Sequence, residues 1–150
     1  MKKIGEYTAR GQFTSLDTAG HKITLFDGSF STAYRVTKFF VSAQDPTDNV
    51  NDCVASLVTE PDLSKGGIWD WSDNREIAWA SSNGSTGTAA TPDGGLIDPD
   101  NLVVEDLYVY GRYDASGETD PINYMIVMEK YDITEARGAL ALVRNNAQKV

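Results

Sequence analysis

Residues 102–132 read LVVEDLYVYGRYDASGETDPINYMIVMEKYD, and this stretch decides the fold. Its two ends, 102–110 and 122–131, are rich in β-branched and aromatic residues, which is typical of β-strands. Between them, residues 111–121 supply glycine, aspartate and proline, the residues that turns and loops favour. The pattern predicts two long strands that pair as an antiparallel hairpin.

Strand 122–131 has apolar side chains on both faces, because neighbouring residues of a strand point in opposite directions. Met125 and Val127 lie on one face, and the other face carries Ile122, Tyr124, Ile126 and Met128. Strict alternation in residues 34–43 likewise sets Phe39 and Val41 against Tyr34, Val36 and Phe40. A two-layer sandwich needs only one apolar face in each sheet. We therefore expect a loop, a helix or another subunit to cover the second face.

The rest of the chain shows the spacing of a mainly β protein. Strands of six to ten residues alternate with turn clusters, which predicts an antiparallel two-sheet sandwich. A jelly roll is the favoured topology, and an immunoglobulin-like sandwich is the alternative. Residues 1–20 have few apolar anchors, and we expect an extended N-terminal arm. Residues 21–150 form the expected sandwich domain. Within it, the glycine-rich stretch 82–95 is expected to be a mobile surface loop or a loop that is ordered only by a neighbour.

A single helix is predicted at the C-terminal end, over residues 133–147. Asp132 is a suitable N-cap, with Glu135 as its reciprocal partner three residues later. An apolar stripe follows, formed by Ala136, Leu140, Val143 and Ala147. This helix would cover the open end of a sheet or pack on a partner, so Leu140 and Val143 are candidate interface residues.

Composition excludes several classes of function. The chain has 150 residues and a formal net charge of −9, which disfavours nucleic-acid binding through the folded body. Cys53 is the single cysteine, so no intramolecular disulfide forms, and its apolar surroundings favour a buried, inert thiol. No stretch has the apolar length of a membrane span, and no signal peptide is expected at the N-terminus.

Catalytic motifs are not recognisable, and we expect a protein that is not an enzyme and needs no cofactor. There is no glycine-rich phosphate loop, no paired metal ligands and no nucleophile elbow. The single His21 is interpreted as a surface histidine. A glycosidase would need two carboxylates in one cleft, which is the third alternative. Asp98 and Asp100 are candidate calcium ligands, although a turn before a strand is the favoured interpretation.

Two tryptophans beside acidic residues mark a second candidate site. Trp69, Asp70, Trp71 and Asn74 combine aromatic platforms with polar groups, as a sugar-binding loop does. The same tryptophans suit a core or a subunit interface, where aromatic residues are enriched. We favour the interface or core over the sugar site. The expected interface set is Phe39, Val41, Trp69, Trp71, Met125, Val127, Leu140 and Val143.

Residues 102–110, 123–131 and 138–146 together resemble small β-rich structural proteins of environmental, especially aquatic, viruses of bacteria. The resemblance covers about the last third of the chain and, more weakly, residues 28–60. It implies a coat or decoration subunit that is made in the host cytoplasm and resides in the virion. Its partners would be copies of itself and other virion proteins, with no membrane. The alternative from another class is a carbohydrate-binding, host-attachment module.

Overall fold

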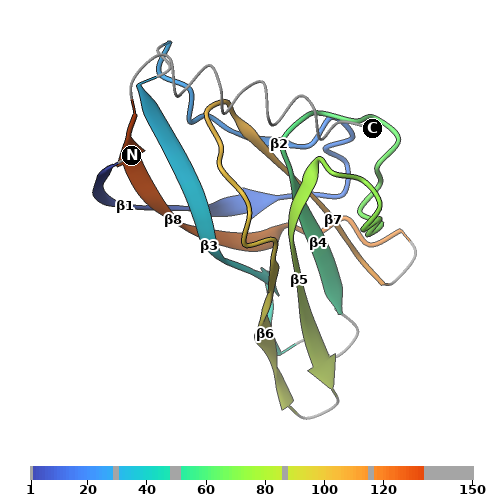
Figure 1. Ribbon diagram of the computed structural model, residues 1–150. Coiled ribbons are helices and arrows are strands. Elements are labelled where there is room, and N and C mark those ends of the chain that lie inside the picture. The colour runs from blue at the N-terminus through green and yellow to red at the C-terminus, as the bar shows by residue number, and fades with distance from the viewer. Residues whose placement is uncertain (1, 29–30, 48–51, 86–87, 115–116, 134–150) are drawn as a thin grey trace.

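The computed structural model describes residues 2–28, 31–47, 52–85, 88–114 and 117–133 (Figure 1). This part of the chain forms eight strands. They are β1 (Lys2–Phe13), β2 (His21–Ile23), β3 (Thr32–Ala43), β4 (Cys53–Val58), β5 (Glu76–Ser85), β6 (Thr88–Ile97), β7 (Leu107–Tyr113) and β8 (Ile122–Asp132). The mainly β class predicted from the sequence is confirmed.

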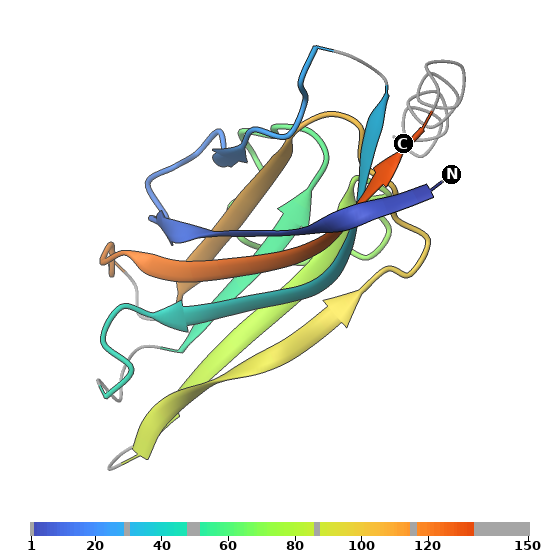
Figure 2. The ribbon, with the colours of Figure 1, turned by 90° about the vertical axis from the view of Figure 1, so that its left-hand side faces the viewer.

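The strands build two antiparallel sheets that pack face to face (Figures 1 and 2). The small sheet has the order β1-β8-β3, and the large sheet has the order β2-β7-β4-β5-β6. The hydrophobic core lies between them and draws on both, with Phe39, Ile126 and Met128 from the small sheet and Leu57 and Val109 from the large one. Each of these five side chains is fully buried, so the inner faces exclude water.

The predicted hairpin of residues 102–132 is wrong. The second predicted strand matches β8, whereas the first, 102–110, overlaps β7 only from Leu107 onward, and β7 continues to Tyr113 within the predicted loop. β7 pairs with β2 and β4 in the large sheet, and β8 pairs with β1 and β3 in the small one. The glycine, aspartate and proline loop therefore crosses from one sheet to the other. β8 is the central strand of its sheet and β7 is an interior strand of the other, and composition alone does not reveal which neighbours such strands pair with.

A β-bulge in β3 corrects the predicted faces of Phe39 and Val41. The register with β8 shifts between Val36 and Lys38, which leaves Thr37 as the additional residue. One extra residue moves every later side chain to the opposite face. Val36, Phe39 and Val41 therefore all point into the core, and the partly exposed Phe40 points outward.

The N-terminal segment is a strand of the small sheet and not a free arm. β1 pairs with β8 along its length, from Lys2 opposite Asp132 to Phe13 opposite Ile122. Ala9 and Phe13 supply its buried side chains. Few apolar residues suffice here because β1 lies at the sheet edge and most of its side chains face solvent.

The described residues of the glycine-rich stretch 82–95 lie in β5 and β6, so the predicted mobile loop is not observed there. β5 and β6 pair as antiparallel neighbours, with Ser82 opposite Pro92 and Asn83 opposite Thr91. Ladder hydrogen bonds join backbone groups, so a sequence with few large side chains can still form strands. β6 also runs alongside β3, at the open edge between the two sheets (Figure 2).

The predicted C-terminal helix, including Leu140 and Val143, lies outside the described residues. Only its first expected residue, Ile133, is described. Its buried side chain belongs to a small apolar cluster with Ala33 and Val104, apart from the main core.

Candidate binding surfaces

A loop covers the outer face of the large sheet. Residues 59–75, which connect β4 to β5 and are called the cap below, fold back over β4 and β7. The backbone amide of Asp62 donates to the Tyr110 hydroxyl at 2.6 Å, and the Trp69 indole Nε1 donates to the Ala55 carbonyl at 3.0 Å. Ser56, on that outer face, is fully buried. The chain thus covers this face with its own loop. The faces for which a cover was expected, those of residues 34–43 and 122–131, belong to the small sheet, where Met125 is exposed.

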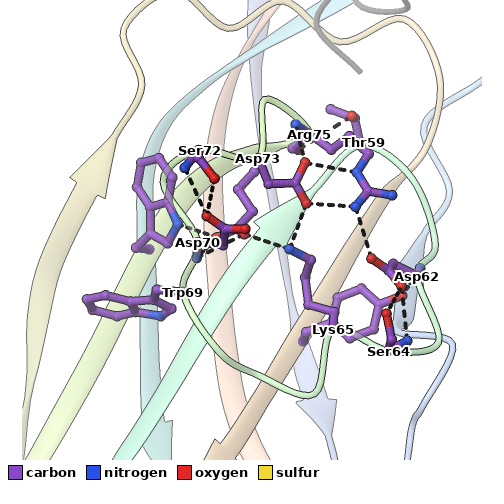
Figure 3. Close-up of polar contacts among 12 residues, drawn as sticks. Thr59, Asp62, Ser64, Lys65, Trp69, Asp70, Ser72, Asp73 and Arg75 are labelled. Carbon is purple, nitrogen blue, oxygen red and sulfur yellow. Dashed lines mark hydrogen bonds and ion pairs between the residues drawn. The ribbon is translucent and has the colours of Figure 1, made fainter. Parts of the chain in front are cut away.

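A buried ionic cluster fixes the cap to β5 (Figure 3). Lys65 Nζ lies 2.9 Å from the Asp73 carboxylate and 2.6 Å from that of Glu76. Arg75 pairs with Asp73 at 2.7 Å and with Asp62 at 2.9 Å. The Lys65 side chain is only 5% exposed and that of Glu76 is 0% exposed, so these charges depend on one another and not on water.

The cluster shifts the pKa values of its members in the direction that favours their charged forms. Hydrogen bonds from Arg75, followed by those from Lys65, hold the pKa of Asp73 well below its ordinary value despite burial. Burial opposes the charged form of Lys65, yet hydrogen bonds to Glu76 and Asp73 outweigh it and raise the pKa of Lys65. Glu76 also accepts hydrogen bonds from the Asp70 backbone amide and the Trp79 indole. At neutral pH these ion pairs and hydrogen bonds therefore hold the cap in place on the sheet.

The cap brings the predicted sugar-site residues into one neighbourhood. Trp71 is 64% exposed and lies against Trp79 of β5, with ring centroids 5.8 Å apart. Trp69 is partly exposed, although its indole N–H is already bonded. Asp70 accepts two hydrogen bonds from Ser72, and Asn74 is exposed. The group offers an aromatic surface with carboxylate and amide groups beside it.

Apolar side chains project from the cap into solvent. Leu63, Ile68 and Trp71 are the most exposed of them, and Leu96 of the neighbouring β6 is exposed as well. Exposed apolar side chains that share one loop are candidates for an interaction site. The cap therefore conceals the sheet but presents an apolar surface of its own.

The remaining predicted interface residues occupy different places. Phe39 and Val41 are buried between the sheets and have no side-chain surface for a partner. Met125 and Val127 point outward from β8 at the centre of the small sheet, where Met125 is exposed and Val127 is half-buried. Leu140 and Val143 lie outside the described residues.

A shallow groove of about 450 Å³ runs over that outer face of the small sheet. Aligned cross-strand rows form it: Arg10, Met125 and Phe40 in one row, and Gln12, Asn123 and Ser42 in the next. Gln12 Nε2 donates to Asn123 Oδ1 at 2.8 Å. Arg10, Gln12 and Phe40 were not predicted as site residues. The alternation within β1 could have paired Arg10 with Gln12, but only the register with β8 and β3 places Phe40 beside them.

The predicted calcium ligands form a turn. The Asp98 carboxylate accepts a hydrogen bond from the backbone amide of Asp100, and the Asn101 side chain donates a hydrogen bond to the Asp98 carbonyl. Asn101 Oδ1 also accepts the Val36 amide at 2.7 Å, which ties this turn to β3. Among the described residues, no group of three or more His, Cys, Asp or Glu side chains is arranged to hold a metal ion.

The other candidate reactive side chains are buried or engaged in contacts within the fold. Cys53 is buried, and this burial raises the pKa of its thiol to about 11, as an inert cysteine requires. His21 is partly buried beside the Tyr124 hydroxyl, 3.1 Å from its Nε2. A depression of about 240 Å³ contains carboxylates of Glu60, Glu105 and Asp106. Asp106, however, is engaged by the Leu25 and Phe26 amides and by Lys22.

The chain matches no protein-family model, no curated protein and no solved structure. The part of the chain that the structure describes contains no helix of the length and apolarity needed to cross a membrane. The function is therefore inferred from the two surfaces described above.

Proposed function

We propose that the protein is a non-enzymatic, self-associating structural subunit of a virion, either a coat or a decoration protein. The observation that carries the proposal is the combination of a two-sheet sandwich with apolar surface on the cap and a groove on the opposite sheet. A subunit of an assembly needs several contact surfaces on one rigid body, and these two lie on separate faces.

The strand order supports a jelly roll, which we propose as the topology. In a jelly roll of eight strands, a long hairpin wraps on itself, so that pairs form between strands 1 and 8, 2 and 7, 3 and 6, and 4 and 5. Ladders join β1 to β8, β2 to β7 and β4 to β5, and β6 runs alongside β3. Viral coat proteins and lectins both use this topology, so it supports a virion role without requiring it.

Sedimentation velocity over a wide range of protein concentration, with negative-stain electron microscopy, tests the proposal. We expect concentration-dependent oligomers and regular rings, tubes or shells. A protein that stays monomeric at high concentration and forms no particles would contradict the proposal.

A matched pair of variants tests whether the apolar cap takes part. Ile68 of the cap is 63% exposed and Ile4 of β1 is 51% exposed. We expect Ile68→Ser to weaken self-association, whereas Ile4→Ser should leave it near the wild-type level. Equal effects of the two substitutions would show that general surface hydrophobicity drives association and not the cap.

Carbohydrate binding is the second candidate, favoured by the exposed Trp71 ring beside Asp70 and Asn74. An exposed aromatic ring can stack on a sugar face while nearby polar groups bind its hydroxyls. A glycan array with the wild-type protein and with Trp71→Ala tests this role. A signal that the substitution abolishes supports it, and an absent or unchanged signal excludes it.

A further inference from the structure

The groove on the small sheet has an unusual charge for this chain. Six of its side chains point outward, and one of them, Arg10, is basic while none is acidic. The next row on the same face adds Lys38 opposite Val127. Neither Arg10 nor Lys38 makes an ion pair with any residue that the structure describes. In a chain with a net charge of −9, the groove and the row beside it thus carry two basic side chains and no carboxylate, and the first carboxylates on this face, Glu6 and Glu129, stand in the row beyond.

The cap has the complementary chemistry. From Thr59 to Arg75 the cap contains four carboxylates and two basic side chains, and Asp70 is exposed between Trp69 and Trp71. Both basic side chains, Lys65 and Arg75, are already paired within the cap. The exposed part of the cap is therefore apolar and acidic, whereas the groove is apolar and basic.

We propose that the groove of one subunit receives the cap of a second copy of this chain. The Trp71 ring would lie on the apolar floor that Phe40 and Met125 form. The Asp70 carboxylate would pair with the Arg10 guanidinium, a charge-assisted contact that fixes orientation as well as adding affinity. This inference rests on the proposed self-association and names the two surfaces that carry it.

The positions of the surfaces decide the kind of assembly. The groove lies on the outer face of the small sheet and the cap lies over the outer face of the large sheet, on opposite sides of the sandwich (Figures 1 and 2). A contact between two different surfaces is heterologous, so each subunit keeps one free cap or groove for the next copy. The contact would generate rings or filaments and not a closed dimer.

Charge reversal tests the contact directly. We expect Arg10→Glu alone and Asp70→Arg alone each to raise the dissociation constant roughly tenfold or more, because each places like charges opposite one another. An equimolar mixture of the two variants should recover association, since every groove then meets a cap of opposite charge. The double variant should recover it as well. Lys2→Glu, a charge reversal elsewhere on β1, is the control.

The outcomes separate this inference from the proposed function. A monomeric wild-type protein contradicts both. A wild-type protein that assembles, with Arg10→Glu and Asp70→Arg assembling equally well, contradicts only the groove and cap contact. An effect of Arg10→Glu that the mixture does not rescue would also overturn it, and would indicate another acidic ligand for the groove. Thermal unfolding of each variant establishes that the fold is retained.

Tryptophan fluorescence supplies an independent measurement. All three tryptophans of the chain lie in or directly beneath the cap, at positions 69, 71 and 79. Burial of Trp71 in a neighbouring groove should shift the emission to shorter wavelength as the protein concentration rises. The same titration with Met125→Lys should show no shift, because the floor of the groove is then charged. A shift that is unchanged in this variant would contradict the proposal.

Discussion

Lys65 shows how one side chain can hold a whole loop in place. It lies under the cap and contacts two carboxylates, that of Asp73, which is almost fully buried, and that of Glu76, which is fully buried. Removing one member of a buried ion pair costs more than the pair contributes, because the remaining charge is left without compensation. The stability of the cap therefore depends on this lysine.

The substitution Lys65→Met should lower the free energy of unfolding by about 3 kcal/mol, as urea denaturation would measure. Lys22→Met is the matched control, since Lys22 is 54% exposed and pairs with Asp106 at 3.3 Å. Loss of this exposed pair should lower the free energy of unfolding by less than about 1 kcal/mol. Equal losses for the two variants would show that the Lys65 cluster contributes no more than a surface ion pair.

Asp73 makes the fold sensitive to acid. Its pKa is lower in the folded protein than in the unfolded chain, chiefly because of Arg75. The unfolded chain therefore takes up a proton first, near pH 4, and stability falls as the pH drops below that value. Asp73→Asn should be less stable at neutral pH but should lose less stability between about pH 5 and pH 2. Denaturation midpoints across this range measure the difference.

At the level of strands, the stability of the fold depends on close packing at Gly111, the glycine of β7. A Cβ atom added to Gly111 would lie 2.6 Å from the Val54 carbonyl oxygen and 2.7 Å from the Phe13 ring. Phe13 belongs to the small sheet and Gly111 to the large one, so this contact sets how closely the two sheets approach.

The substitution Gly111→Ala should therefore destabilise the protein by about 1–3 kcal/mol through overpacking. Gly5→Ala in β1 is the control, because an added Cβ there meets nothing within 4 Å. That variant should change stability by less than about 1 kcal/mol, in the stabilising direction. Thermal unfolding of both variants measures the contrast.

The positions of strands could be predicted from the sequence where their side chains have strand composition. Runs of β-branched and aromatic residues located β3, β8 and part of β7, but not their partners, because ladders join backbone N–H and C=O groups that nearly every residue carries. Thr37 gives no sign that it is the additional residue of a bulge, and that residue decides the orientation of Phe39 and Val41. The tryptophans of the candidate site were visible in the sequence. The groove could not be predicted from the sequence, because it depends on the register between strands that are distant in the chain.

The whole molecule is held together by contacts between the ends of the described chain. β8, near residue 132, is the central strand of the small sheet and pairs with β1, near residue 2. Contacts between residues so distant in sequence slow the search for the native state. We expect refolding in milliseconds to seconds, as stopped-flow tryptophan fluorescence would measure. Refolding within microseconds would contradict this account.

The bulge between Lys3 and Gly5 has a consequence for how copies of the protein can meet. β1 is an edge strand, and an edge with free backbone groups can recruit foreign strands into amyloid-like growth. Its irregular backbone and its lysines at positions 2 and 3 discourage that growth. Fibrils that bind thioflavin should therefore be rare in native preparations, and ordered assemblies should dissolve to folded subunits instead of persisting as cross-β aggregates.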